Sequence, residues 1–212
     1  MVDFTKMQKD RILNHLYKNY KKIDFDNIDQ EFFFKKQEGL NFFDKKELLI
    51  KISELIFEDL DKRFLSEVKS KINKFYKTNE KISFLLNKRF QIEKKYKDLT
   101  QKIFIHLIKN NNSGKVLTYI YSVADLMWKY ANDRSVDFNY YTKRLILSSV
   151  YLKILILIFY KEKLTQKDLE KEIKKSLEHV KLLSQFKVKL DFFKNIKDFL
   201  NFFSIQKTGR GF

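Results

Sequence analysis

Apolar residues recur at steps of three and four along most of this chain, the spacing that places them on one face of an α-helix. The clearest run is 45–65, with apolar positions at Leu48, Ile52, Leu55, Ile56 and Leu60 among charged neighbours. An earlier stripe comprises Ile12, Leu13, Leu16, Tyr17 and Tyr20. The pattern predicts a long amphipathic helix at 45–65. Two or three short helices should precede it, one starting in the Asp- and Asn-containing segment 23–30.

Turn-forming residues inside the chain gather at 110–114, where the sequence is NNNSG. The apolar spacing before this turn predicts two or three further helices within 66–109. Near the other end of the chain, the segment 164–183 has the same helical spacing. Thr165 and Asp168 precede its apolar positions as a capping box with the shorter acid would, so they mark the start of that helix.

Between these segments the pattern predicts a helix over about 116–130, then a tight corner and a second helix running from residue 135 or 137 to about 160. Asn132 tolerates the left-handed backbone that closes a helix, and Asp137 in the next first turn favours the helix dipole. The part at 145–160 is the most apolar of the chain. It is shorter than the roughly 20 residues that span a bilayer and contains Lys153, so it predicts a buried helix.

Composition supports an all-α fold, because the chain has no proline and four glycines. There is no cysteine, which excludes disulfides and thiolate metal sites. The first residues are charged where an export signal would be apolar, so we expect a protein that stays inside the cell. The formal charge of +17 is compatible with nucleic-acid binding, but six of the 44 basic residues are Arg and the lysines are spread along the chain. Lysine is also specified by A+T-rich codons, so a base-composition bias is an alternative source of part of this charge.

The segment 187–212 combines basic residues with an aromatic helical face, which is typical of a helix lying on a membrane surface. The predicted membrane-binding residues are Phe192, Phe193, Ile196, Phe199, Leu200 and Phe203. The alternative is that this face packs on the rest of the chain or on a second subunit.

The predicted corner concentrates unusual residues. Asp137, Tyr140, Tyr141 and Arg144 are spaced so that they share one helical face. Aromatic and Arg side chains of this kind anchor protein interfaces. The alternative is a structural pair between Asp137 and Arg144 with the tyrosines half-buried.

Catalytic patterns are missing from the sequence. The three histidines, His15, His106 and His179, are far apart and form no metal-binding spacing. No nucleophile triad and no glycine-rich phosphate loop is present. We therefore expect a non-enzymatic protein without a cofactor or a bound metal.

The corner also carries a resemblance. From Trp128 to Arg144 the sequence follows W-x-x-A-G-D-x-S-x-D-F-N-x-Y-T-x-R, apart from Asn132 in the place of the glycine. This string resembles the signature of the Coq-nine family, the ubiquinone (coenzyme Q) biosynthesis accessory proteins. Asn is the usual substitute for Gly at a left-handed helix end, so the corner should persist. The strong similarity covers about 116–160.

The resemblance implies a TetR-like helical bundle of about nine helices plus a C-terminal amphipathic helix. It implies a degenerate helix-turn-helix-like bundle at 1–62, a ligand-binding and dimerisation domain at 63–186, and a membrane-binding helix and tail at 187–212. The resemblance further implies a homodimer that binds an isoprenoid quinone or precursor lipid and presents it to the ubiquinone-pathway hydroxylase. It would be cytoplasmic and peripheral on the inner face of the cell membrane.

Residue roles follow from the same resemblance. The hydroxylase-binding patch would comprise Met127, Trp128, Asp137, Tyr140, Tyr141 and Arg144. The lipid-binding cavity would be lined by Ile105, Ile108, Leu147, Tyr151, Ile154, Leu155 and Ile158. The alternative function is that of a TetR-like DNA-binding transcriptional regulator. The segment 28–39 leaves no room for a standard recognition helix, so we expect no specific nucleic-acid binding.

Overall fold

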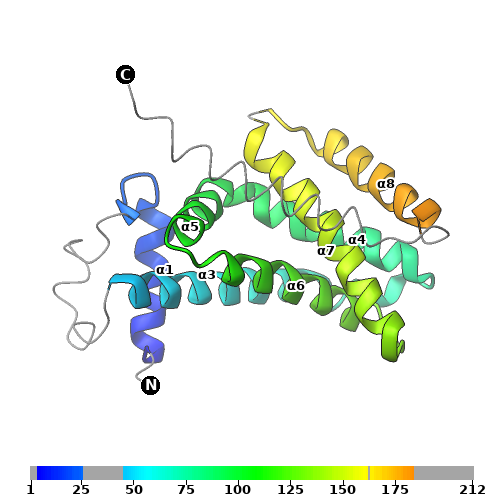
Figure 1. Ribbon diagram of the computed structural model, residues 1–212, viewed down its shortest axis with the longest axis horizontal. Helices are drawn as coiled ribbons and strands as arrows, with labels where there is room; N and C mark the ends of the chain where they lie inside the picture. The colour runs from blue at the N-terminus through cyan, green and yellow to red at the C-terminus, as the bar shows by residue number, and fades with distance from the viewer. Residues whose placement is uncertain (1–3, 26–44, 162, 184–212) are drawn as a thin grey trace.

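The computed structural model describes residues 4–25, 45–161 and 163–183 (Figure 1). Within these ranges the chain forms seven α-helices, one short 3-10 helix and no strand, so the predicted all-α class is confirmed. The helices are α1 (Lys6–Asn19), α3 (Lys45–Val68), η2 (Ile72–Lys74), α4 (Thr78–Lys95), α5 (Lys97–Lys109), α6 (Ser113–Tyr130), α7 (Asp137–Tyr160) and α8 (Gln166–Leu183).

Capping residues account for several helix ends. Thr5 opens α1 by a reciprocal capping box with Gln8. Thr165 and Asp168 form the box predicted for α8, since each side chain accepts the backbone N–H of the other. The predicted turn between α5 and α6 is present at Asn111, where φ is +61°. The helix after it begins at Ser113, three residues earlier than its apolar pattern indicated.

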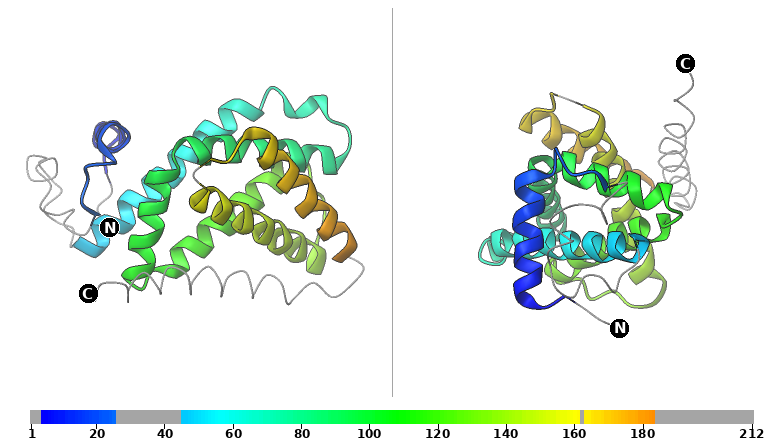
Figure 2. Two further views of the ribbon diagram at one scale, coloured as in Figure 1. Left: turned by 90° about the horizontal axis from the view of Figure 1, so that it is seen from above. Right: turned by 90° about the vertical axis from the view of Figure 1, so that its left-hand side faces the viewer.

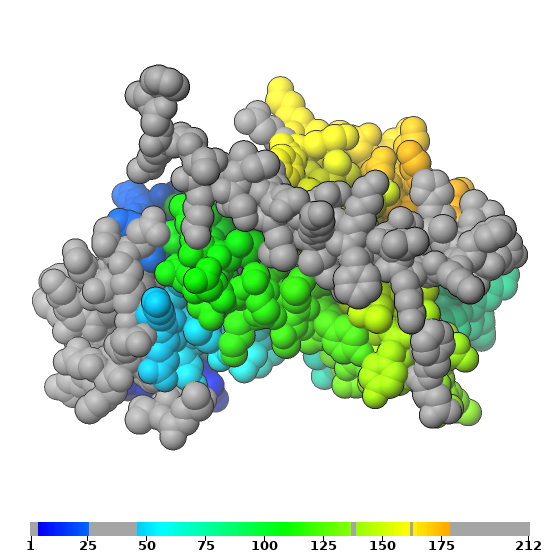
Figure 3. Space-filling model, in the orientation of Figure 1, coloured from blue at the N-terminus to red at the C-terminus, as the bar shows by residue number. Residues whose placement is uncertain are grey.

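Helices α4 and α7 join the rest of the bundle. Helix α7 contacts α4, α5, α6 and α8, and α4 also contacts α3, α5, α6 and α8. Helix α3 contacts α1, α4 and α5. In Figures 1 and 2, α1 crosses one end of α3 and α8 lies toward the opposite end of the molecule. In the space-filling view, the green segment that contains α6 lies beside α3 and reaches the first turns of α7 (Figure 3). The corner between α6 and α7 therefore lies far from α1.

The core runs continuously from α1 to α8. Ile12 and Leu16 contribute from α1, and the stripe predicted on α3 is buried from Leu48 to Leu60. The last 14 residues of α7 face neighbours on several sides, which explains why their sequence is apolar nearly all round. None of the helices in the described ranges is long and apolar enough to cross a membrane.

Some predictions fall outside the described residues. These are the helix start within 26–30, the segment 28–39 where a recognition helix would lie, and the amphipathic helix at 187–212. The total of about nine helices consequently stays a prediction. Helix α3 runs without a break through residues 62 and 63, where the resemblance places a domain boundary. The division into three domains also stays a prediction.

Candidate functional site

The turn between α6 and α7 is built by backbone geometry at Asn132. Its φ is +61°, the left-handed conformation predicted for this position. The backbone N–H of Asp133 donates to the Trp128 carbonyl at 3.1 Å, and that of Ala131 donates to the Met127 carbonyl at 2.9 Å. These bonds satisfy the last carbonyls of α6. The chain then reverses, and α7 begins at Asp137 as predicted.

Arg144 lies inside this corner, with 2% of its surface exposed. Its Nε donates to Asp125 Oδ1 at 2.6 Å, and its Nη1 lies 3.3 Å from Asp133 Oδ2. The same Nη1 donates to the carbonyl of Tyr140 at 3.0 Å. The sequence suggested Asp137 as the partner, but the side chain of Asp137 lies outside the described part of the structure. Arg144 thus ties α7 to both α6 and the connecting turn.

Two carboxylates complete this charged network. Burial opposes ionisation of Asp133, but hydrogen bonds from Lys143 and Ser135 outweigh it and lower the pKa of Asp133 to about 2. Burial acts in the same direction on Asp125, yet hydrogen bonds from Lys129 and Arg144 lower its pKa as well. Both carboxylates are therefore ionised over the physiological pH range, which keeps the guanidinium paired.

The two tyrosines of the corner differ in exposure. Tyr140 is half-buried, with its ring centroid 3.3 Å from the Arg144 guanidinium carbon and its hydroxyl donating to Asp125 at 3.1 Å. Tyr141 is 61% exposed and packs edge-on against Tyr140, with centroids 5.1 Å apart. Val136 and Leu145 are exposed apolar side chains flanking Tyr141 in sequence. Sequence reasoning missed these two, although residues 141 and 145 are one helical turn apart.

The other predicted patch residues lie deeper. Met127 is completely buried in the core. Trp128 is partly buried; its indole Nε1 donates to the Lys143 carbonyl at 3.0 Å, and the Lys143 ammonium lies 5.3 Å from its ring centroid. The structure thus brings Trp128, Tyr140, Tyr141 and Arg144 to one corner but exposes chiefly Tyr141. Their predicted role in partner binding stays a prediction.

An apolar cavity of about 580 Å³ adjoins the corner. It opens between α4, α7 and α8 and the last turn of α6. Its wall consists mainly of aliphatic side chains and the Trp128 ring, and charged or polar side chains complete it. The lining residues are Asn79, Glu80, Ile82, Ser83, Trp128, Lys143, Ile146, Leu147, Val150, Lys174, Leu177 and Glu178.

The predicted lipid-lining residues are divided by the fold. Leu147 lines the cavity, and its contact with a lipid stays a prediction. The remaining α7 residues of that set pack into the protein core and are at most 1% exposed: Tyr151, Ile154, Leu155 and Ile158. Ile105 and Ile108 on α5 are partly buried against the same core. The predicted membrane-binding residues of segment 187–212 lie outside the described ranges.

A buried polar cluster in the core was not predicted from the sequence. Glu93 Oε1 accepts hydrogen bonds from Arg89 Nε at 3.0 Å, from the Tyr119 hydroxyl at 2.8 Å and from the Tyr151 hydroxyl at 2.6 Å. Arg89 also donates to Asp61 at 2.6 Å. Burial raises the pKa of both tyrosines, so they stay neutral donors. The spacing of Arg89 and Glu93 at i and i+4 among apolar residues of α4 was the available signal.

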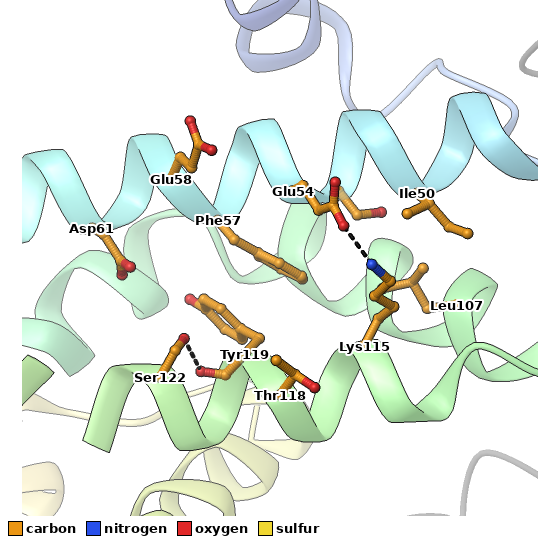
Figure 4. A pocket seen from close by; sticks show the side chains of 11 residues that line it. Ile50, Glu54, Phe57, Glu58, Asp61, Leu107, Lys115, Thr118, Tyr119 and Ser122 are labelled. Atoms are coloured by element: carbon orange, nitrogen blue, oxygen red, sulfur yellow. Dashed lines mark hydrogen bonds and ion pairs between the residues drawn. The ribbon is translucent and has the colours of Figure 1, made fainter. Parts of the chain in front are cut away.

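A second, smaller cavity of about 260 Å³ lies between α3 and α6 (Figure 4). Phe57 and Tyr119 stack in its wall with centroids 3.9 Å apart. Lys115 on α6 pairs with Glu54 on α3 at 2.6 Å across the space. Its lining includes more carboxylates than the cavity beside the corner, which makes it the less suitable of the two for an apolar tail.

The described residues contain no cluster of three His, Asp or Glu side chains that could hold a metal ion. The expectation of a protein without metal or cofactor remains a prediction, because it also concerns the rest of the chain.

Comparison with known proteins yields one family. Residues 114–184 match the model of the COQ9 family. The predicted resemblance to COQ9 is thereby confirmed for this part of the chain. The bovine (Bos taurus) relative, a mitochondrial ubiquinone biosynthesis protein COQ9, is 40% identical over 50 residues, which are 24% of this chain and 16% of the relative. The human (Homo sapiens) and rat (Rattus norvegicus) proteins of the same name are each 42% identical over 45 residues, or 21% of this chain and 14% of theirs.

The similarity to COQ9 is local. The aligned segment spans less than a sixth of the rat and human relatives and about a sixth of the bovine one. No solved structure matches the chain. The COQ9-matched segment nevertheless contains the whole corner, together with the walls that α6, α7 and α8 contribute to the larger cavity. The two features that could bind a ligand and a partner therefore lie in the part of the chain that resembles COQ9.

Proposed function

We propose that this chain is a non-catalytic accessory protein of ubiquinone biosynthesis. It binds an isoprenoid quinone or precursor and presents it to a membrane-associated hydroxylase of that pathway. The named relatives are ubiquinone biosynthesis proteins, and the match covers the structural features that such a role would use.

The observation that carries the proposal is the apolar cavity beside the corner. Its volume of about 580 Å³ falls in the range of roughly 300–1,000 Å³ that small-molecule sites occupy. Ile82, Ile146 and Val150 offer an aliphatic wall to a prenyl chain. Burial of the chain stabilises the complex by about 25 cal/mol for each Å² of apolar surface removed from water. The polar groups of the cavity would accommodate the ring oxygens.

The corner supplies the surface for the hydroxylase. Tyr141 offers an exposed aromatic ring, and Val136 and Leu145 add apolar area next to it in sequence. An exposed aromatic ring is a typical interface anchor, and exposed apolar area beside it is typical of an interaction surface. Arg144, which the sequence suggested as a contact residue, would act from inside by holding the Tyr140 backbone and ring.

Membrane attachment is assigned to the segment 187–212. Its apolar face would lie in the lipid interface on the inner face of the cell membrane, and each nearby Lys would add about 1 kcal/mol on an anionic leaflet. Phe199→Glu is expected to abolish flotation with anionic liposomes, and unchanged flotation would refute this assignment. We also propose that the chain acts as a homodimer, as the resemblance to COQ9 implies.

The decisive experiment is mass spectrometry of organic extracts from protein purified without detergent. We expect a stoichiometric isoprenoid quinone or precursor. Ile146→Trp fills the cavity and should remove this lipid. Ile156→Trp is the matched control, because Ile156 is a partly buried α7 residue outside the cavity lining. A folded but empty wild-type protein would refute lipid binding, and equal lipid content in both variants would refute the cavity assignment.

A further inference from the structure

Lys143 belongs to both features of the candidate site. Its side chain lines the apolar cavity. Its ammonium lies 5.3 Å from the centroid of Trp128, which lines the same cavity, and donates to Asp133 Oδ1 at 2.8 Å. A single side chain therefore contacts the space for a ligand and the charged network of the corner.

The contacts continue from Asp133 to the surface. Its second carboxylate oxygen, Oδ2, lies 3.3 Å from Arg144 Nη1. Arg144 in turn holds the Tyr140 carbonyl at 3.0 Å and stacks on the Tyr140 ring. Tyr140 packs edge-on against the exposed Tyr141. A continuous path of direct contacts thus joins the cavity wall to the exposed ring.

The chemistry of an ammonium group adds a means of recognition. A Lys side chain has three N–H donors, and Asp133 accepts one of them. An anionic head group in the cavity would attract the same ammonium and weaken its bond to Asp133. Lys174 also lines the cavity. The two carboxylates in the cavity lining, Glu80 and Glu178, would repel an anion, although Glu80 is paired with Lys77 at 4.0 Å. Of the two lysines, Lys143 is the one that is bonded to Asp133 and so to the corner.

We propose that Lys143 is the specificity-determining residue for an amphiphile with an anionic head group, and that its bond to Asp133 conveys occupancy of the cavity to the corner. This inference rests on the proposed function, since it needs the cavity to hold an amphiphile. It narrows the ligand from a neutral quinone to a precursor whose head group is anionic, and it names the residue that recognises this head group. A neutral amphiphile of the same chain length would bind more weakly and leave the corner unchanged.

The fluorescence of Trp128 provides the test, because it is the only tryptophan in the sequence. The full chain is titrated with oleate and, separately, with oleyl alcohol, which has the same chain and a neutral head. We expect wild type to prefer oleate by at least tenfold. Lys143→Met keeps the aliphatic stem and should reduce this preference to within twofold, while Lys143→Arg should retain it. Lys129→Met is the control, since Lys129 pairs with Asp125 outside the cavity lining.

Hydrogen exchange at residues 131–141 measures the second half of the proposal. Oleate should accelerate exchange there in wild type and in Lys129→Met but not in Lys143→Met. Equal affinity of wild type for both amphiphiles, a preference that survives Lys143→Met, or oleate binding without a change in exchange would overturn the inference and leave the proposed function standing. No binding of either amphiphile, together with an empty purified protein, would overturn both.

Discussion

Replacing Arg144 by Met tests whether the corner depends on its buried guanidinium. Met preserves much of the aliphatic stem but leaves Asp133, whose side chain is 4% exposed, with one cationic partner fewer. Breaking a buried ion pair from one side costs about 3–5 kcal/mol. Asp133 keeps Lys143, and Asp125 is 17% exposed and keeps Lys129 at 2.7 Å, so the cost should lie at the lower end of that range. We expect a loss of about 3 kcal/mol in the free energy of unfolding.

The assay is thermal and urea unfolding followed by circular dichroism at neutral pH. For a chain of this size the loss corresponds to a drop in Tm of about 6–12 °C. Lys129→Met is the matched control, because it removes an exposed cation from the same Asp125 and should cost less than about 1 kcal/mol. Adding Asp133→Asn to Arg144→Met should recover part of the loss. An Arg144→Met protein as stable as Lys129→Met would show that the corner does not depend on the buried guanidinium.

Three further outcomes are expected. Because the pKa of Asp133 is depressed from 3.8 to about 2, its ionised form contributes about 2 kcal/mol above pH 4, and this contribution disappears as the pH falls through 2. Unfolding of wild type and Asp133→Asn should therefore differ at pH 6 and converge near pH 2; a constant difference would contradict this. Asn132→Ala should lower stability by about 1 kcal/mol while Asn132→Gly should not, because φ is +61° there; equal melting temperatures would reject the strain argument. Tyr151→Phe removes a 2.6 Å donor to buried Glu93 and should cost about 1–3 kcal/mol in urea unfolding; unchanged stability would contradict a stabilising role for this hydrogen bond.

Most helices in the described residues could be predicted from local sequence. The three- and four-residue spacing predicted α3 and α7, and Asn132 predicted the left-handed corner between α6 and α7. These predictions succeeded because helix periodicity, capping and backbone conformation depend on residues within one or two turns. The resemblance to COQ9 was readable for the same reason, as its residues are contiguous.

The ion-pair partners of the buried charged residues could not be predicted from the sequence. Arg144 pairs with Asp125, 19 residues earlier in the chain, and Arg89 pairs with Asp61, 28 residues earlier. Any acid on the correct helix face could have served, and the choice depends on how the helices cross. Tyr151 illustrates the consequence, because the resemblance implied a lipid-lining role for it while its hydroxyl donates to Glu93 in the core.

The sequence by itself determined the all-α class found in the described residues, the position of the corner between α6 and α7, and the similarity of that corner to COQ9. Each of these is encoded by residues close together along the chain. Tertiary structure decided which face of α7 meets the core and which side chains line a cavity. It also decided that Arg144 points inward while Tyr141 stays exposed. Such outcomes depend on the relative placement of α4, α6, α7 and α8, and packing between distant segments is what fixes that placement.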